Sequence, residues 1–549
     1  MSVRTRATMR ATALVAVLAT TGLLAGCATT PAGAPAAQTI TYAIEGANLS
    51  AGHMDPHSSQ LDVSALVGRY TLDSLVAQDN DGTFVPWLAK SWTISDDQLH
   101  YTFELRDDVT FTDGEKFDAE AVKANFDHIT AEETASAQAA GMIGYSADGG
   151  SYIDTEVVGH YTVRVNFARP YAPFLQAAST ALLGMYSPAV LSGKADELKT
   201  GGPGITVGSG PFILTEYTPD QELVYSVNPE YAWPPANAEH EGRSTLDELV
   251  IRILPETSVR TGALTSGEVQ VAGNITPSEV SAVEGDYTVS SVELPGIPYS
   301  LYLNETNGVF ADPKVREAFS IGFDLDSAVD SIFYGVYPRA WSILGPTTPN
   351  SYDESLEGSW PFDAERAATL LDEAGWTETD SEGYRTKDGE RLSARWIAWT
   401  PIPDDRAALA DVIQSDLKKI GFEITREALE PAAYNEQYGP KTFDLTDWGF
   451  SGVDADALRS HLHSGGFQNA SQVSDDYVDE LLDEAVAVTD NGSRTALYQE
   501  VQNWNAENDA IVPLYVPSMI TAASPTVAGL EFDLYGRPLF YGASLTAAE

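Results

Sequence analysis

The stretch PWLAKSW at residues 86–92 places two tryptophans on either side of a short apolar pair. Rings this close together are typical of a buried anchor, because each aromatic side chain removes a large apolar area from water. Further along the chain, the stretch VGSGPF at 207–212 sets Gly208 and Gly210 in front of a proline. This pattern predicts a tight turn into a strand, at which two backbone segments can approach closely.

The sequence around these stretches alternates between strand-like and helix-like runs. Residues 101–105 (YTFEL) and 163–167 (VRVNF) alternate apolar and polar side chains, which predicts half-buried strands. Residues 363–375 begin with an Asp that can cap a helix and end with a Gly that can stop one. A second helix is expected at 407–420, followed by a strand at 422–424. This succession of helices and strands predicts an α/β protein with layered sheets.

The N-terminus has the features of an export signal. Three arginines precede an apolar run at residues 11–24, which is too short for a membrane span. Cys27, the only cysteine of the chain, follows Leu-Ala-Gly, and this arrangement resembles the lipobox of bacterial lipoproteins. The resemblance implies that residues 1–27 are a lipoprotein signal peptide and that Cys27 is diacylated, which would give stable anchoring. The alternative is a secreted protein with an incidental cysteine.

The composition excludes several classes of partner. The 549-residue chain has 31 Lys and Arg against 80 Asp and Glu, a formal net charge of −49. Nucleic acid and anionic membrane surfaces bind through Lys and Arg, so neither is expected as a partner. With 43% hydrophobic residues, the chain can bury a large core and should form two or three domains. With Cys27 as its single cysteine, the chain can form no internal disulfide.

Several motifs occur in the order known from one protein family. They are DSLV at 73–76, PWLAKSW at 86–92, LRDDVTF at 105–111, VGSGPF at 207–212, DPKVREA at 312–318, the helix at 364–376 and VPLY at 512–515. Together they resemble the extracytoplasmic family 5 solute-binding proteins of peptide-type ABC importers. That family includes dipeptide, oligopeptide and nickel binders.

The resemblance implies a periplasmic-binding-protein-like class II fold. Such a fold has two α/β lobes joined by a two-segment hinge, with an extra domain inserted in the first lobe. We assign 28–38 to a flexible tether, 39–60, 205–293 and 513–549 to lobe I, 61–204 to the inserted domain and 294–512 to lobe III. The chain should cross between lobes near 293–295 and 508–513, and two crossings make a hinge suited to closure.

The resemblance also implies a function. We expect a monomeric lipoprotein on the outer face of the cytoplasmic membrane, which captures peptides or a peptide-like solute by lobe closure. It would deliver this ligand to ABC permease and ATPase subunits, without a cofactor. The alternatives are an oligosaccharide-binding or nickel-binding member of the family, and a signal-peptide receptor that does not take part in transport.

The segment 443–456 (FDLTDWGFSGVDAD) is the expected ligand segment. In the peptide binders it carries a Trp followed by an Asp that pairs with the peptide α-ammonium group. Placing Trp448 on the family's Trp puts Ser451 at the position of that Asp, and Asp454 on a later acid. A hydroxyl cannot replace a buried carboxylate facing an ammonium group, so the site should not hold free peptide N-termini in the family's manner. Asp447 either supplies the missing charge or is a solvated loop acid.

Trp448 is the strongest candidate for a ligand contact, because an indole in a cleft loop can stack on a ring, a peptide plane or a cation. The alternative is a tryptophan of the core. The other expected ligand contacts are Gly449, Phe450, Trp399, Thr400, Gly52 and His53.

Catalysis and metal binding are not expected. His53 and His57, and likewise His461 and His463, have metal-ligand spacing, but no sulfur ligand or supporting hydrogen bond can be read from the sequence. Acidic pairs that resemble glycosidase carboxylates are frequent by chance in so acidic a chain. The sequence contains no Gly-x-Ser-x-Gly or His-Glu-x-x-His motif and no catalytic cysteine. A secreted hydrolase is therefore disfavoured.

Overall fold

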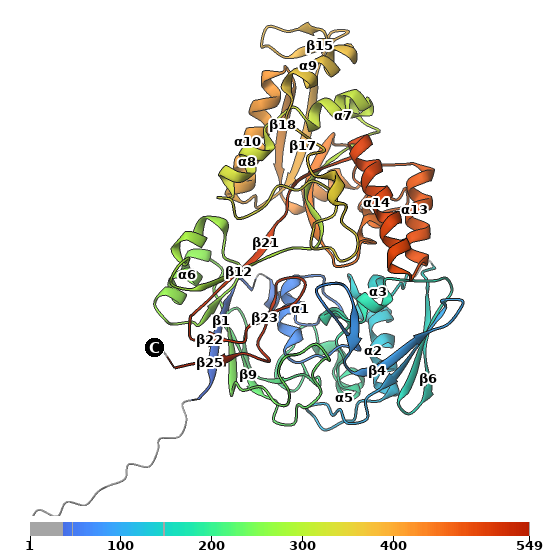
Figure 1. Cartoon of the computed structure of the whole chain (residues 1–549), viewed down its shortest axis with the longest axis vertical. Coiled ribbons are helices and arrows are strands. Elements are labelled where there is room, and N and C mark those ends of the chain that lie inside the picture. Colours follow the sequence, from blue (N-terminus) through green and yellow to red (C-terminus); the bar gives the residue numbers. More distant parts are fainter. Residues whose placement is uncertain (1–36, 47, 147–148, 548–549) are drawn as a thin grey trace, which may run out of the picture. The chain divides into compact units, whose positions relative to one another are not determined.

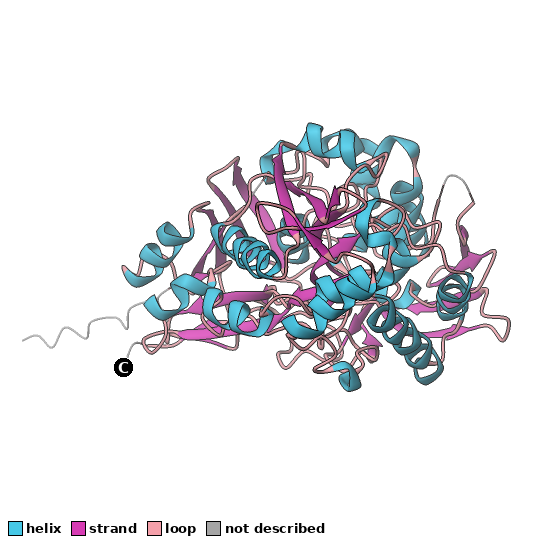
Figure 2. Cartoon of the chain, turned by 90° about the horizontal axis from the view of Figure 1, so that it is seen from above, coloured by secondary structure: helices cyan, strands magenta, loops and turns pink. Residues whose placement is uncertain are grey.

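The computed structural model describes residues 37–46, 48–146 and 149–547 (Figure 1). The expected signal peptide 1–27, its Cys27 and nearly all of the tether 28–38 lie outside the described residues, so these remain predictions. Helices and strands alternate along the rest of the chain (Figure 2). The α/β fold class predicted from the sequence is confirmed.

A seven-stranded sheet is built from strands that are far apart in the sequence. Its order is β12 (Thr288–Glu293), β21 (Ser518–Ala523), β11 (Val271–Ala272), β1 (Thr39–Ile44), β10 (Glu248–Ile253), β9 (Glu222–Val227) and β8 (Phe212–Thr218). β1 is parallel to β10, with Thr39 opposite Glu248. Alternate residues of β10, such as Leu249 and Ile251, are buried because one face of the sheet packs on a hydrophobic core. All of these strands come from the segments assigned to lobe I.

A five-stranded sheet forms the second α/β layer. Its order is β18 (Glu423–Leu429), β17 (Ser393–Trp399), β19 (Leu445–Ser451), β13 (Gly296–Leu303) and β20 (Ile511–Tyr515). Every residue of β13 is buried, as expected for a central strand covered on both faces. The parallel strands β17 and β18 are joined by a helix, the connection that parallel strands require.

The helices of this part of the chain cover its sheet. They are α7 (Pro313–Ser320), α8 (Leu325–Ile332), α9 (Ala364–Glu373), α10 (Asp404–Lys419), α11 (Pro431–Tyr438), α12 (Ala457–Leu462), α13 (Asp476–Ala487) and α14 (Asn491–Asn508). The predicted helix at 363–375 is confirmed as α9, whose cap Asp363 accepts a hydrogen bond from the Arg366 backbone N–H at 2.8 Å. The predicted helix at 407–420 is α10, which begins three residues earlier with two acids in its first turn.

A four-stranded antiparallel sheet marks the expected inserted domain. Its order is β4 (Ala89–Ile94), β5 (His100–Leu105), β7 (Thr162–Phe167) and β6 (Tyr152–Gly159), which confirms the strands predicted at 101–105 and 163–167. The helices in this part are α1 (Asp62–Arg69), α2 (Ala119–Thr130), α3 (Ala139–Met142), α4 (Phe174–Ala177) and α5 (Pro188–Gly193). Phe103, Phe126 and Phe174 pack edge to face in its core.

Short elements complete the fold. They are α6 (Thr257–Thr265) and the strands β2 (Val76–Gln78), β3 (Phe84–Pro86), β14 (Glu378–Thr379), β15 (Arg385–Lys387), β16 (Glu390–Arg391), β22 (Val527–Ala528), β23 (Glu531–Phe532), β24 (Pro538–Leu539) and β25 (Ser544–Leu545). Among residues 37–547, outside the masked positions, no helix is long and apolar enough to cross a membrane.

The two motifs that opened the sequence analysis meet the expected packing. Trp87 is buried, and Trp92 is half-buried and packs against the hydrophobic core around the four-stranded sheet. Gly208 and Gly210 lie against the backbone of Thr71, where a Cβ on either glycine would collide with Thr71 backbone atoms. The Gly210 N–H donates to the Thr71 carbonyl oxygen at 2.9 Å. The close approach of two backbone segments is therefore confirmed.

The chain crosses between the two large sheets twice. The first crossing joins β12 to β13 at 294–295, as predicted, and the second joins β20 to β21 at 516–517. The Leu294 N–H donates to the Pro517 carbonyl oxygen at 2.8 Å, so the two crossings lie side by side. The second crossing falls a few residues after the predicted 508–513. The reason is that β20 is an edge strand, on which Pro513 is tolerated, so the sheet continues to Tyr515.

Candidate functional site

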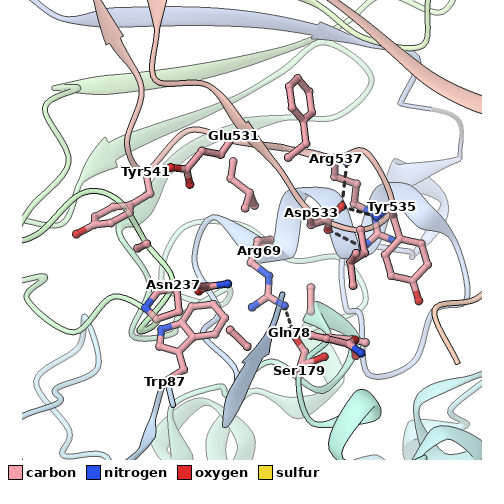
Figure 3. Close-up of a pocket in the computed structure, with 18 of the residues that line it drawn as sticks. Arg69, Gln78, Trp87, Ser179, Asn237, Glu531, Asp533, Tyr535, Arg537 and Tyr541 are labelled. Atoms are coloured by element: carbon pink, nitrogen blue, oxygen red, sulfur yellow. Dashed lines mark hydrogen bonds and ion pairs between the residues drawn. The ribbon is translucent and has the colours of Figure 1, made fainter. Parts of the chain in front are cut away.

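A cavity of about 440 Å³ lies beside the C-terminal end of α1 (Figure 3). Its walls come from α1, from β2 and the residues around it, from the turn after α4, from 231–239 and from the C-terminal segment 531–541. The segment 294–512 contributes one residue, the buried Val453. The cavity is of the size usual for small-molecule sites, and charged, amide and aromatic side chains converge on it.

Arg69, the last residue of α1, extends its guanidinium group into this space (Figure 3). It donates to the carbonyl oxygens of Leu72 and Ser179 and to the Ser74 hydroxyl, at 2.9–3.3 Å. The group also lies over the Trp87 ring, 4.9 Å from its centroid. Within the described part of the chain, Arg69 forms no ion pair. Burial lowers the pKa of Arg69 to about 10, partly opposed by Asp533 and Asp73, so the side chain stays charged at neutral pH.

The C-terminal segment supplies the acidic part of the wall. Asp533 faces Arg537, and Arg537 also donates to Asp62 at 2.8 Å from its Nε, so one arginine is shared by two carboxylates. Glu531 lines the same cavity and forms no ion pair among the described residues. Burial and then the nearby Glu239 raise the pKa of Glu531 above its usual value. The cavity therefore contains one cation without an ion pair, Arg69, and three acids without one among the described residues, Asp79, Glu239 and Glu531.

Neutral donors complete the wall. In the described structure the buried indole Nε1 of Trp87 has no hydrogen-bond partner. The amide of Asn237 donates to Asp79 at 2.8 Å, which fixes its orientation, and Gln78 lies nearby (Figure 3). The Tyr541 hydroxyl donates to the carbonyl oxygen of residue 242 at 2.5 Å. Carbonyl or carboxylate oxygens of a ligand could accept hydrogen bonds from the Trp87 N–H and from the amide groups of Gln78 and Asn237.

A second cavity of about 500 Å³ has a charged lining in which an arginine and two acids already pair with one another. Its charged lining includes Asp456, Arg459 and Asp483. Arg459 already pairs with Asp456 at 3.1 Å and with Asp483 at 2.7 Å. Arg169, the fourth charged residue of this lining, is exposed and forms no ion pair among the described residues, so only part of the charge is compensated.

Trp448, in β19, lies outside the 440 Å³ cavity. Its ring stacks on Tyr302 with centroids 4.2 Å apart and an interplanar angle of 23°, and Tyr438 packs on it edge-on. This is the packing of a tryptophan at the border of the core, the alternative that the sequence analysis left open. The role of Trp448 in ligand binding stays a prediction.

The two acids predicted as ligand contacts, Asp447 and Asp454, already have partners. Asp447, half-buried, accepts a hydrogen bond from the Tyr299 hydroxyl. The Arg406 guanidinium lies 4.2 Å from the centroid of the Tyr299 ring, and burial raises the pKa of Asp447. Asp454 accepts two hydrogen bonds from Arg494, at 2.6 and 2.8 Å. Neither acid lines the 440 Å³ cavity.

The remaining predicted contacts also lie elsewhere. Ser451 is exposed at the end of β19 and pairs with Gly296, while Phe450 packs against the ring of His461. The other predicted contacts are the exposed Gly449 and Trp399 and the half-buried Thr400, Gly52 and His53. None of the residues predicted to contact the ligand lines the 440 Å³ cavity. Their roles as ligand contacts stay predictions.

Sequence reasoning missed the residues that do line the cavity, apart from Trp87. Arg69 stands at the end of an otherwise apolar helix, and Asp533, Tyr535 and Arg537 alternate with other residues in a loop near the C-terminus. An arginine on an apolar helix was a usable signal, because a buried charge needs compensation. The acids of 531–541 gave no signal in so acidic a chain.

Comparisons with known proteins agree on one family. The model described as bacterial extracellular solute-binding proteins, family 5 Middle, matches residues 83–469. Di/tripeptide-binding protein 2 of Pseudomonas aeruginosa is 30% identical over 478 residues, which cover 82% of this chain and 84% of the relative. The nickel-binding periplasmic protein of Escherichia coli is 26% identical over 503 residues, 88% of this chain and 90% of the relative. The structure of NikA from Brucella suis in complex with Fe(III)-EDTA superposes with a TM-score of 0.79 at 26% identity, covering 92% of this chain and all of NikA.

Proposed function

Because the chain belongs to the family 5 bacterial extracellular solute-binding proteins, we propose that it is the substrate-binding lipoprotein of an ABC importer and captures peptides or a peptide-like solute. The proteins of this family bind solutes and are not enzymes, which agrees with the prediction that this chain does no chemistry. Delivery of the solute to permease and ATPase subunits, and anchoring through Cys27, are parts of the proposal.

The observation that carries the ligand class is the presence of uncompensated charges of both signs in one cavity. Arg69 has no carboxylate partner and Glu531 no cationic partner among the described residues, and both line the same 440 Å³ space. A small zwitterion supplies one charge for each. A peptide carboxylate would accept charge-assisted hydrogen bonds from Arg69, and an α-ammonium group would face Glu531.

The neutral donors fit the main chain of a peptide. The indole N–H of Trp87 and the amides of Gln78 and Asn237 line the same cavity as the charged groups. Peptide carbonyl oxygens accept hydrogen bonds from such groups whatever the side chains of the peptide are. The names of two relatives point to the same class of ligand: a di/tripeptide-binding protein and a glutathione-binding protein.

The residues of the expected ligand segment that follow β19 support a site that does not bind the α-ammonium group in the manner usual for the family. Val453 is the residue of that segment that reaches the cavity, and it carries no charge. The next acid, Asp454, is engaged by Arg494. We therefore assign recognition of the ligand's cationic end to Glu531, and peptides with blocked or modified N-termini remain compatible with the site.

Lobe closure is supported by polar contacts between the segment 294–512 and the rest of the chain. The Val453 N–H donates to the Tyr535 hydroxyl at 3.4 Å, and the Thr489 hydroxyl donates to Gln98 at 2.7 Å. Each hydrogen bond joins a residue of the segment 294–512 to a residue outside that segment. Ligand that binds only the closed form would stabilise these contacts by mass action.

The test is a thermal-shift screen of di- and tripeptides, their N-acetylated and C-amidated forms, oligosaccharides and Ni²⁺. A peptide at about a hundredfold excess over its Kd should stabilise the protein by about 2.7 kcal/mol. C-amidation should abolish most of the shift, because it removes the negative charge that faces Arg69. A shift with oligosaccharides or Ni²⁺ and none with any peptide would refute the peptide proposal and favour the alternatives.

Val453→Asp offers a second arm for the same screen. It places a carboxylate beside the cavity, so unmodified peptides should gain affinity over their N-acetylated forms. Val453→Leu is the matched control, because it alters volume without adding charge. Equal affinity ratios in both variants would show that the cationic end of the ligand does not lie near Val453.

Anchoring is tested separately. Cys27→Ser should prevent lipidation and release the protein from membranes into the soluble fraction. Full retention of the Cys27→Ser protein on membranes without cleavage would contradict the lipoprotein assignment and leave the solute-binding proposal unaffected.

A further inference from the structure

Asp55, His57 and His128 form a buried cluster apart from the ligand cavity. Asp55 and His57 are 1% and 0% exposed, and the side chain of His128 is 12% exposed. One ligand atom from each residue lies within 4.8 Å of the other two. The cluster joins the loop after β1 to α2, two segments about 70 residues apart in the sequence.

The hydrogen bonds of His57 determine which of its ring nitrogens carries the proton. Its Nε2 lies 2.8 Å from the carbonyl oxygen of Gly184, which can only accept, so Nε2 is the protonated nitrogen. Nδ1 is therefore a lone-pair atom, and it has no hydrogen-bond partner among the described residues. Nδ1 is the ring nitrogen nearer to the His57 backbone N–H, which donates to the Asp55 carboxylate at 3.0 Å.

His128 is oriented in the same way by Thr134. The Thr134 hydroxyl donates its one proton to the His128 carbonyl oxygen at 2.5 Å. It also lies 3.2 Å from His128 Nδ1, and with its proton already used it accepts there. The proton of His128 is therefore on Nδ1, which leaves Nε2 as a lone-pair atom. In the described structure Nε2 has no hydrogen-bond partner and lies 3.9 Å from the Asp55 carboxylate.

His57 Nδ1 and His128 Nε2 thus carry lone pairs that no described donor meets, in a cluster with the Asp55 carboxylate. Two imidazole nitrogens and a carboxylate cannot hydrogen-bond among themselves in these tautomers, and an unsatisfied buried group is costly. A divalent cation resolves the conflict, because it binds neutral imidazole nitrogen and carboxylate oxygen together. The N–H of each ring is held by an oxygen atom, the usual arrangement behind a metal-ligating histidine.

We propose that Asp55, His57 and His128 bind a zinc-type divalent transition metal ion in a structural site. Zinc bonds of about 2.0–2.2 Å place two ligands of a tetrahedral ion about 3.4 Å apart, so the side chains need to move together only slightly. Ca²⁺ and Mg²⁺ prefer all-oxygen sites and do not suit two nitrogens. Tyr186 has its ring edge-on to His57, and its hydroxyl interacts with the Asp55 carboxylate.

Such an ion would tie lobe I to the inserted domain. The segment around His57 already contacts the loop after α2, since the Ser136 hydroxyl donates to the His57 carbonyl oxygen at 2.7 Å. A metal at this junction holds the helix α2 against the chain that leads into the ligand cavity. No metal was predicted from the sequence, because His128 and the Gly184 carbonyl that orients His57 are both far from His57 along the chain.

The experiment unfolds the purified protein with a chelator and refolds it with one equivalent of Zn²⁺ or Co²⁺, followed by desalting. We expect about one metal ion per chain by elemental analysis, and Co²⁺ absorption bands typical of nitrogen and oxygen ligands. His57→Gln and His128→Gln should lose the metal. His461→Gln is the matched control, because His461 is buried, its Nε2 has no described partner, and it belongs to no ligand cluster.

Thr134 provides variants that leave all three ligands in place. Thr134→Val should weaken zinc binding about 10–100-fold through loss of the support for His128, and Thr134→Ser should restore it. A protein that retains no zinc after refolding overturns the proposal. It is also overturned if His57→Gln, His128→Gln and His461→Gln retain equal amounts, since the metal would then lie elsewhere, including in the solute cavity.

Discussion

Arg494, beside the segment after β19, and Arg69, in the cavity wall, are both removed from bulk water, but only one has a carboxylate partner. Arg494 binds Asp454 through two hydrogen bonds, and its Nε donates to the carbonyl oxygen of Ala485. Arg69 donates only to neutral oxygens. Desolvation is costly for both side chains, and in Arg494 the Asp454 carboxylate offsets that cost within the protein.

The difference separates a structural ion pair from a binding group. The two regions contain the same residue types: acids, arginines and aromatic rings. In the region of β19 the acids Asp447 and Asp454 are already engaged by Tyr299 and Arg494. In the cavity, Arg69 and Glu531 are left for a solute, which is why we place the ligand there.

The largest expected effect is on stability, at the paired arginine. Asp454→Asn leaves Arg494 with no carboxylate at a site where both side chains are about 15% exposed. We expect a loss of about 3 kcal/mol of unfolding free energy, measured by urea denaturation. Asp127→Asn, which breaks the exposed pair with Lys123, is the control and should cost less than about 1 kcal/mol. Equal effects of the two substitutions would remove the distinction between the two arginines.

Arg69→Gln should act on ligand affinity rather than on stability. Loss of the cationic group should weaken binding of a peptide from the screen by about 2–4 kcal/mol, measured by calorimetry. The C-amidated form of that peptide should be insensitive to the substitution, which makes a double-mutant cycle. The exposed Arg243→Gln is the control. Unchanged peptide affinity in Arg69→Gln would place the ligand carboxylate elsewhere.

A pair of tryptophans sharpens the comparison further. The indole N–H of each has no hydrogen-bond partner in the described structure, but Trp87 lines the cavity and Trp448 stacks on Tyr302 outside it. Trp87→Phe should therefore weaken peptide binding, by up to about 2 kcal/mol, while Trp448→Phe leaves the affinity near that of the wild type. The reverse result would restore Trp448 to the site, as the sequence analysis predicted.

The smallest effect concerns pH and the packing around β19. Burial lowers the pKa of His461 from 6.5 to about 4. The folded protein therefore favours neutral His461, and its contribution to stability, complete above about pH 6.5, is lost as the pH falls towards 4. Between about pH 7 and pH 5, the unfolding free energy of the wild type should therefore fall by about 1–2 kcal/mol more than that of His461→Gln. An equal fall in both proteins would mean that His461 is accessible to water and that the region around β19 is not tightly packed.

The sequence alone determined the family, the α/β class and several elements. Local patterns were sufficient for the strands at 101–105 and 163–167 and for the helix capped by Asp363, because alternation and capping act over a few residues. The family motifs followed from the same kind of evidence, since Gly208 and Gly210 report a backbone approach that no other residue allows. The second crossing was misplaced by a few residues because strand pairing, not propensity, sets where β20 ends.

Only the tertiary structure decided which charged groups are free. Asp454 and Arg494 are 40 residues apart, and Arg69 and Glu531 more than 400, so the sequence gives no indication of which acid meets which base. The same holds for the cluster of Asp55, His57 and His128. In this cluster the tautomers of the two histidines depend on Gly184 and Thr134. Residue type determines what a side chain can bind. Whether it is already bound depends on neighbours that folding brings within about 3 Å, the distance at which hydrogen bonds and ion pairs form.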